Sequence, residues 1–238
     1  MIGQPGVLVF ARHGSSRLAG KPLLDIGGRT LLGRVLDRVR RLTTVPVVVC
    51  TSLESSDDAI EVLATNEAAA CFRGPLHDVA ARALGAATQF GFDRFARVCG
   101  DRPFLDPTLI RDFLALAAEG QFDLVTNAIG GTYAPGLTTE VVRTSALARI
   151  VDATADPEDR EHLTRFFYRR PSGFRIHNVP APHGRYAGTR LVVDTVEDLE
   201  RARSIAGALV SNPEADTPEQ IVALGRAFDA LRTGVDPQ

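Results

Sequence analysis

The chain has 238 residues, a formal net charge of −2 and a pI near 6.2, and 45% of its residues are hydrophobic. This is enough apolar material for one large buried core, while the weak charge without a basic run argues against a nucleic-acid-binding protein. No signal-peptide pattern and no apolar run of about eighteen residues is present, and the three cysteines form no CxxC pair. We therefore expect a cytoplasmic protein without membrane contact.

Short β-rich runs alternate with helical patterns over the first part of the chain. Strands are predicted at 7–11, 45–51, 69–72, 95–99 and 122–126. Helices are predicted at 30–41, near 56–65, at 78–90 and after Asp106-Pro107, where Asp106 is a good N-cap. Because the strands are continuously apolar, the pattern predicts an α/β fold whose parallel sheet is covered by helices on both faces.

The rhythm loosens at about 130–190, where Gly, Pro and His are scattered among short segments, and we expect an excursion from the sheet there. A last strand is predicted at 191–193, followed by a helix at 196–209. Residues 211–218 read as a linker, and Thr217 starts a capping-box pattern for a terminal helix. The predicted organisation is a domain over 1–210, with the linker and helix of 211–238 packing on it.

A polar, glycine-containing loop follows the first strand, from Arg12 to Lys21, where open α/β sheets bind nucleotides. Five residues, not four, separate Gly14 from Gly20, and Pro22 takes the Ser/Thr position, so the P-loop pattern fails. No G-x-G-x-x-G follows. The loop offers N–H groups, hydroxyls and cations to a polyphosphate, and the alternative is a solvated basic loop. Lys21 is the only lysine of the chain.

Two aspartates each follow a predicted strand, Asp101 after 95–99 and Asp194 after 191–193. Both carboxylates are therefore expected at the carboxyl edge of the sheet, where they can converge on one Mg²⁺ together with substrate phosphates. The alternatives are that Asp101 only ends a strand and that Asp194 only caps the next helix. Thr195 is itself a good cap, which leaves Asp194 freer for a metal.

The segment ARHGSSRLAGKPL, which begins at Ala11, resembles the N-terminal signature of the CMP-sugar-acid synthetases, especially the spore-coat-polysaccharide cytidylyltransferase branch. Further segments resemble that family in the same order, at 72–74 with 77–82, 97–103, 136–141, 161–164 and 193–199. The resemblance thus covers most of the chain.

The resemblance implies a three-layer α/β/α Rossmann-like (GT-A-like) nucleotidyltransferase fold that transfers CMP from CTP to an acidic acceptor and releases pyrophosphate. It implies that Arg12, Lys21 and Asp101 act in catalysis and that Asp101 and Asp194 hold Mg²⁺. The implied nucleotide-binding residues are Ala11, Arg12, Gly14, Ser15, Ser16, Arg17, Lys21, Arg73, Asp78 and Arg82. For Arg17 a solvent position, and for Arg82 a place on a helix surface, are the alternatives.

The acceptor side rests on family analogy alone, which implies Arg102, Glu140, Glu161, His162 and Arg165 as acceptor-binding residues. His162 is either a base or a structural partner of Glu161. The arginine-rich segments of this region fit an anionic acceptor and a solvated face equally well. The middle region is shorter than in the synthetases for large sugar acids, which leaves room for a smaller carboxylate or phosphonate. A homodimer is possible.

Two other functions remain open at this point. A nucleotide-sugar-dependent glycosyltransferase has an overlapping fold, but such enzymes usually hold their metal with D-x-D, whereas this strand ends in Gly100-Asp101-Arg102-Pro103. A non-catalytic nucleotide-binding protein is the second alternative, although every expected charged position is occupied.

Overall fold

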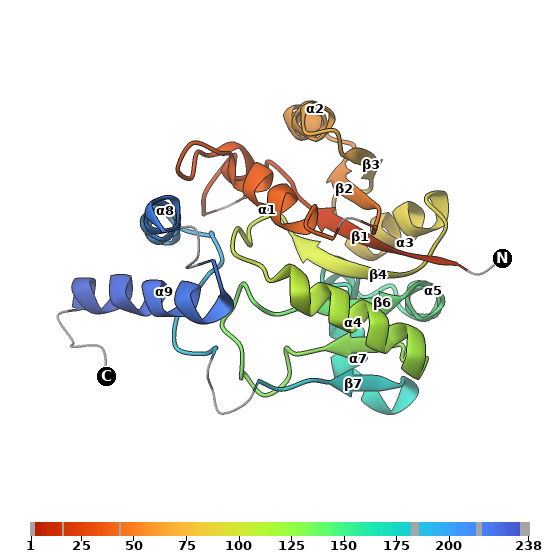
Figure 1. The fold of residues 1–238 in the computed structure, drawn as a ribbon. Helices are drawn as coiled ribbons and strands as arrows, with labels where there is room; N and C mark the ends of the chain where they lie inside the picture. The colour runs from red at the N-terminus through yellow and green to blue at the C-terminus, as the bar shows by residue number, and fades with distance from the viewer. Residues whose placement is uncertain (1–2, 16, 43, 182–185, 213–215, 234–238) are drawn as a thin grey trace.

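A seven-stranded sheet lies at the centre of the computed structural model, which describes residues 3–15, 17–42, 44–181, 186–212 and 216–233 (Figure 1). The strands stand in the order β3-β2-β1-β4-β6-β5-β7. Their bounds are β1 Gln4–Phe10, β2 Val47–Ser52, β3 Ala70–Gly74, β4 Phe92–Cys99, β5 Leu124–Thr126, β6 Glu140–Arg143 and β7 Ile176–Asn178. Only β6 runs antiparallel to its neighbours, so the predicted mostly parallel sheet is confirmed.

Helices cover both faces of this sheet. Their bounds are α1 Leu31–Val39, α2 Asp58–Asn66, α3 Val79–Gln89, α4 Pro107–Gly120, α5 Thr144–Ala153, α6 Pro157–Glu161, α7 Arg165–Arg169, α8 Val196–Ser211 and α9 Pro218–Thr233. Residues of α1, α2 and α4 share one core with the sheet, and residues of α3, α5 and α7 share the core of the opposite face. The three-layer prediction is therefore confirmed.

Local sequence explains where these helices begin. The Thr30 hydroxyl accepts a hydrogen bond from the Gly33 N–H at 3.0 Å at the start of α1, and Asp106 caps α4 with Pro107 as its first residue. The apolar side chains of α1 recur at helical spacing and are fully buried. They are Leu31, Leu32, Val35, Leu36 and Val39. The sheet face beneath them is equally apolar, because its strands are covered on both sides.

The strand predicted at 191–193 is wrong. This segment is extended but belongs to no strand: the Val193 N–H donates to the Asp101 carbonyl at 2.9 Å and the Leu191 N–H to the Pro135 carbonyl at 2.8 Å. The physical reason is that β6 already occupies the edge of β4, which leaves the segment no strand to pair with there. Residues 130–190, the expected excursion, return to the sheet twice, as β6 and β7.

The carboxyl ends of the parallel strands face α8 and α9, at the end of the molecule opposite the N-terminus (Figure 1). A third hydrophobic core joins these two helices to the irregular segments around Leu137 and Leu191. It includes Leu199 and Ile205 of α8 and Ile221 of α9. Part of the predicted linker, residues 213–215, lies outside the described residues. None of the helices described here is long and apolar enough to cross a membrane.

Gly136 gives this arrangement a testable weak point. Its φ is +108°, and a Cβ at this position would lie 2.6 Å from the backbone carbon and oxygen of Leu191. We expect Gly136→Ala to lower the free energy of unfolding by about 2 kcal/mol or more, because both strain and overlap with a backbone result. Thermal and urea unfolding measure the loss. Gly207→Ala in α8, where a Cβ meets nothing within 4 Å, is the control and should be neutral or slightly stabilising. Equal stability of the two variants would contradict the prediction.

Candidate active site

A pocket of about 360 Å³ opens at the carboxyl ends of β1 and β4. Its walls come from the loop after β1, the face of β4, the start of α3, the end of α6 and the segment before α8. The sequence-predicted residues that line it are Ala11, Arg12, Gly14, Ser15, Arg17, Lys21, Arg82, Asp101, Glu161, His162 and Asp194. A larger hollow of about 720 Å³ lies by α1 and the starts of α4 and α9, but none of these residues lines it.

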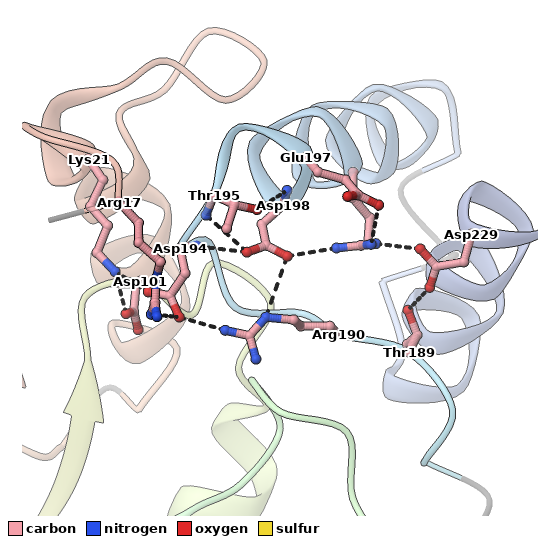
Figure 2. A network of polar contacts seen from close by, with 11 residues as sticks. Arg17, Lys21, Asp101, Thr189, Arg190, Asp194, Thr195, Glu197, Asp198 and Asp229 are labelled. Carbon is pink, nitrogen blue, oxygen red and sulfur yellow. Dashed lines mark hydrogen bonds and ion pairs between the residues drawn. The ribbon is translucent and has the colours of Figure 1, made fainter. Parts of the chain in front are cut away.

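At the centre of the pocket, the Lys21 Nζ lies 2.7 Å from the Asp101 Oδ2 and 2.7 Å from the Asp194 Oδ1 (Figure 2). The three side chains are only 14%, 21% and 16% exposed. Burial works against the charge of Lys21, but the two carboxylates more than offset it and raise the pKa of the ammonium above its ordinary value. Two carboxylates from distant segments thus converge on one cation.

Hydrogen bonds of the backbone set the position of Asp194. Asp198, in the first turn of α8, accepts the N–H groups of Asp194 and Thr195, each at 3.0 Å (Figure 2). Thr195 caps the same helix and completes a capping box with Asp198. Together with the bond from Val193 to the Asp101 carbonyl, this fixes the two aspartates relative to each other.

A second layer of ion pairs supports Asp198. Arg201 donates to the Asp198 carboxylate at 2.8 Å and to Asp229 of α9 at 2.7 Å, and Thr189 donates to Asp229 at 2.8 Å. Arg201 and Asp198 are almost fully buried. Sequence reasoning missed this chain of contacts. The only sequence signal was the spacing of Thr195 and Asp198, which is that of a capping box.

Asp57 anchors the loop after β1. It was not identified from the sequence. Its buried carboxylate accepts the His13 N–H at 2.6 Å, the Ser52 N–H at 3.0 Å and the Ser52 hydroxyl at 2.5 Å. Burial alone would raise the pKa of Asp57, but these hydrogen bonds lower it below its ordinary value. The carboxylate is therefore an anionic anchor for the first residues of the loop.

The remaining cations of the pocket differ in their partners. Arg12 pairs with Glu161 at 2.9 Å, which links the loop to α6, and Arg17 pairs with Asp194 at 3.1 Å. Arg82 is 3% exposed, donates to the Pro75 carbonyl, and has no partner for its Nε within the described part of the chain. The alternative of a solvated helix surface does not describe Arg82, because its side chain is buried under the pocket.

Several predicted nucleotide-binding residues lie elsewhere. Arg73 is not part of the pocket wall, because its guanidinium pairs with Asp58 and Glu61 of α2. Asp78 caps α3 and pairs with Arg160 at 2.7 Å. Both contacts hold elements together behind the pocket. Ser16 lies outside the described residues, so the structure gives no information on it.

Three of the predicted acceptor-binding residues also point away from the pocket. Arg102 donates to the Thr138 carbonyl at 2.5 Å, and Arg165 pairs with Asp159. Glu140 is buried behind Arg97 on the neighbouring strand. Arg97 itself lines the pocket, although it was not among the predicted site residues.

The donor set at the centre fits a hard divalent cation bound together with a substrate. Among the described residues there is no group of three or more His, Cys, Asp or Glu side chains that could enclose a metal. One or two carboxylates completed by phosphate oxygens are what Mg²⁺ usually takes. Asp101 and Asp194 fit this pattern, and the Lys21 ammonium shows that both carboxylates reach one cation.

The fold and the site fit a nucleotidyltransferase, and comparison with known proteins shows the family. Residues 6–222 match the family model for cytidylyltransferases. The chain therefore belongs to the cytidylyltransferase family, as the resemblance of its motifs predicted.

Individual relatives agree with this assignment. The spore coat polysaccharide biosynthesis protein SpsF of Bacillus subtilis is 29% identical over 94% of this chain and 95% of its own length. A 3-deoxy-manno-octulosonate cytidylyltransferase of Xanthobacter autotrophicus is 30% identical over 98% of this chain and 89% of its own. The solved structure of a cytidylyltransferase from Leptospira borgpetersenii superimposes with a TM-score of 0.85 at 28% identity, covering 99% of this chain and 98% of that one.

Asp57 offers a test of how the loop is held. We expect Asp57→Asn to weaken nucleotide binding and to cost about 2 kcal/mol of stability, because the amide replaces an anionic acceptor of several hydrogen bonds. Calorimetric titration with CTP and thermal unfolding measure the two effects. Asp58→Asn, at the exposed neighbouring position, is the matched control and should change neither by much. Unchanged nucleotide affinity in Asp57→Asn would show that the anchor is dispensable.

Proposed function

We propose that the chain transfers CMP from CTP to a small acidic acceptor, with release of pyrophosphate. The observation that carries this proposal is the convergence of Asp101 and Asp194 on Lys21 beside a loop rich in cations and N–H groups. The Xanthobacter relative is named for cytidylyl transfer to 3-deoxy-manno-octulosonate, a sugar acid. This supports an acid as the acceptor. The reaction is attack of an acceptor oxygen on the α-phosphorus of CTP, with pyrophosphate leaving.

The residues of the loop supply charge and position. Arg12 and Lys21 neutralise the β- and γ-phosphates, and the Ser15 hydroxyl lies where it can bond a phosphate oxygen while it orders the loop through the Leu18 N–H. Catalysis is then mostly orientation and electrostatic stabilisation. Asp101 and Asp194 hold Mg²⁺, which when bound would neutralise the triphosphate and the leaving pyrophosphate.

Lys21 has to leave the aspartates when substrate enters. In the structure its ammonium occupies the point on which both carboxylates converge. A triphosphate would offer Lys21 new anionic partners, and Asp101 and Asp194 would then be free to hold the divalent cation. The flexible four-carbon side chain of lysine allows this movement, to which the planar guanidinium of arginine is less suited.

The direct test of the proposed function is pyrophosphate release by the purified full-length chain with each of the four NTPs and a panel of sugar acids, smaller hydroxy acids and phosphonates. CTP should be preferred. Lys21→Ala and Asp101→Asn should each lower turnover by roughly two orders of magnitude or more without unfolding the chain, since both act on transition-state charge.

Asp112→Asn, at an exposed aspartate of α4 paired with Arg111, is the matched control for Asp101→Asn and should keep normal rates. Circular dichroism establishes that each variant is folded. Equal use of all four NTPs across the panel, or wild-type rates in either site variant, would overturn the proposed function.

The position of Lys21 also predicts how the metal binds. Without nucleotide, the wild-type chain should bind Mn²⁺ weakly, because the ammonium occupies the point between both carboxylates, and Asp194 also pairs with Arg17 and Arg190. Lys21→Ala should bind Mn²⁺ severalfold more tightly in the same conditions, whereas Lys21→Ala combined with Asp194→Asn should not. Electron paramagnetic resonance of free Mn²⁺ measures this directly. Weaker Mn²⁺ binding by Lys21→Ala than by the wild type would contradict the exchange of cations.

A further inference from the structure

Arg97 is a charged residue on the central part of the sheet. It lies on β4, between β1 and β6, and lines the pocket together with Cys99 and with Phe10 of β1. Because the rise of a strand is about 3.3 Å per residue, Arg97 lies roughly 7 Å inside the end of β4. Asp101 follows just beyond the carboxyl end of the same strand. The pocket therefore continues from the metal-binding carboxylates inward to a guanidinium.

Glu140 holds this guanidinium from behind. The two residues are register partners on antiparallel strands, and the Arg97 Nη1 donates to the Glu140 Oε2 at 2.6 Å. The other oxygen of Glu140 accepts from the Tyr168 hydroxyl at 2.7 Å. Burial alone would raise the pKa of Glu140, but Arg97 and Tyr168 lower it below its ordinary value. Glu140 is 4% exposed and does not line the pocket, so it acts through Arg97.

The ion pair leaves part of the guanidinium without a partner. Glu140 takes Nη1, while the buried Nε has no hydrogen-bond partner in the described part of the chain. The Arg97 side chain is nevertheless 19% exposed and forms part of the pocket wall, so an anion in the pocket can contact its guanidinium. An acid group is the kind of ligand that a guanidinium bonds most strongly.

Of the other arginine and lysine side chains that line the pocket, three lie on the loop side, and the fourth, Arg82, is almost fully buried and donates to the Pro75 carbonyl. Arg12 pairs with Glu161, and Arg17 and Lys21 contact Asp194 beside the loop that receives the triphosphate. Cytosine and ribose carry no charge. The acid group of the acceptor is then the remaining anion of the proposed reaction.

We propose that Arg97 binds the acid group of the acceptor and that Glu140 and Tyr168 are positioning residues for it. This inference rests on the proposed function and specifies its substrate class: the acceptor enters with its carboxylate, or an equivalent acid group, directed toward β4. Arg97 then determines specificity for acids, while the Arg12–Lys21 loop determines binding of the triphosphate.

The experiment compares each acid with its uncharged methyl ester in the full chain, starting from 3-deoxy-manno-octulosonate and including smaller hydroxy acids and phosphonates. The wild type should prefer the acid. Arg97→Met should raise the KM for the acid by about tenfold or more, because an ion pair with the acid group is lost, and should change the KM for CTP and for the ester by less than about twofold.

Arg94→Met is the matched control, because Arg94 lies on the same strand with a similarly exposed side chain, 21% against 19%, but pairs with Asp93 outside the pocket. Arg97→Met leaves the buried Glu140 without its ion-pair partner, so the double variant with Glu140→Gln and the charge-keeping Arg97→Lys guard against misfolding. Glu140→Gln alone should raise the KM for the acid less than Arg97→Met does, again with the KM for CTP unchanged.

Acid binding is also followed without turnover, by the rise in Tm that each acid gives the CTP-bound chain in EDTA, which removes the divalent metal that the proposed reaction needs. An acid-dependent rise in the wild type that is lost in Arg97→Met supports the inference. The inference is overturned by an unchanged KM for the acid, by an equal rise in the KM for CTP, or by no acid stabilising the wild type more than its ester. Failure of the proposed function differs from these results, because it would be an absence of CTP-dependent pyrophosphate release by the wild type.

Discussion

The shared contact of two carboxylates with the Lys21 ammonium is the interaction on which the site depends. Asp101 and Asp194 are like charges held close together, and without a cation between them they would repel each other. The ammonium therefore stabilises the segment before α8 against the end of β4 and fixes one end of the loop after β1. On the proposed function, the same constraint prepares the site for a divalent cation, because the carboxylates need a positive charge in either state.

This contact extends to the C-terminal helix through a continuous series of polar contacts. Asp229 of α9 binds Arg201, Arg201 binds Asp198, and Asp198 accepts the backbone N–H of Asp194. Because Asp198 and Arg201 are almost fully buried, removing either one would take from the other an ion pair that is shielded from water, and would leave Arg201 with Asp229 or Asp198 with Arg190. The helices α8 and α9 are far from the first strand in sequence, yet they set the position of a residue that acts beside it.

Patterns local in sequence predicted most of the fold, and contacts between distant segments account for what was missed. Apolar runs located strands, and helical spacing with the cap at Asp106 located helices, whereas β6 and β7 contain only two and one apolar residues and so form no apolar run. The strand at 191–193 was wrong because extended backbone needs a free neighbouring edge. Motif order placed Arg73 and Glu140 near the site, but it cannot show which way a side chain points. Arg73 pairs with Glu61, and Glu140 lies behind Arg97, so neither side chain is part of the pocket wall.

The distribution of charge within the pocket explains how two anionic substrates can share one small space. On the proposed function, the triphosphate meets cations on a loop whose backbone is anchored by Asp57, and these cations can exchange partners with Asp101 and Asp194. Arg97 differs from them, because a strand fixes its backbone and Glu140 fixes its guanidinium. A movable set of cations suits a group that must leave as pyrophosphate, whereas a fixed cation suits an acceptor whose oxygen must be held in line with phosphorus. On these proposals, the sheet and the loop supply the two kinds of binding that the transfer requires.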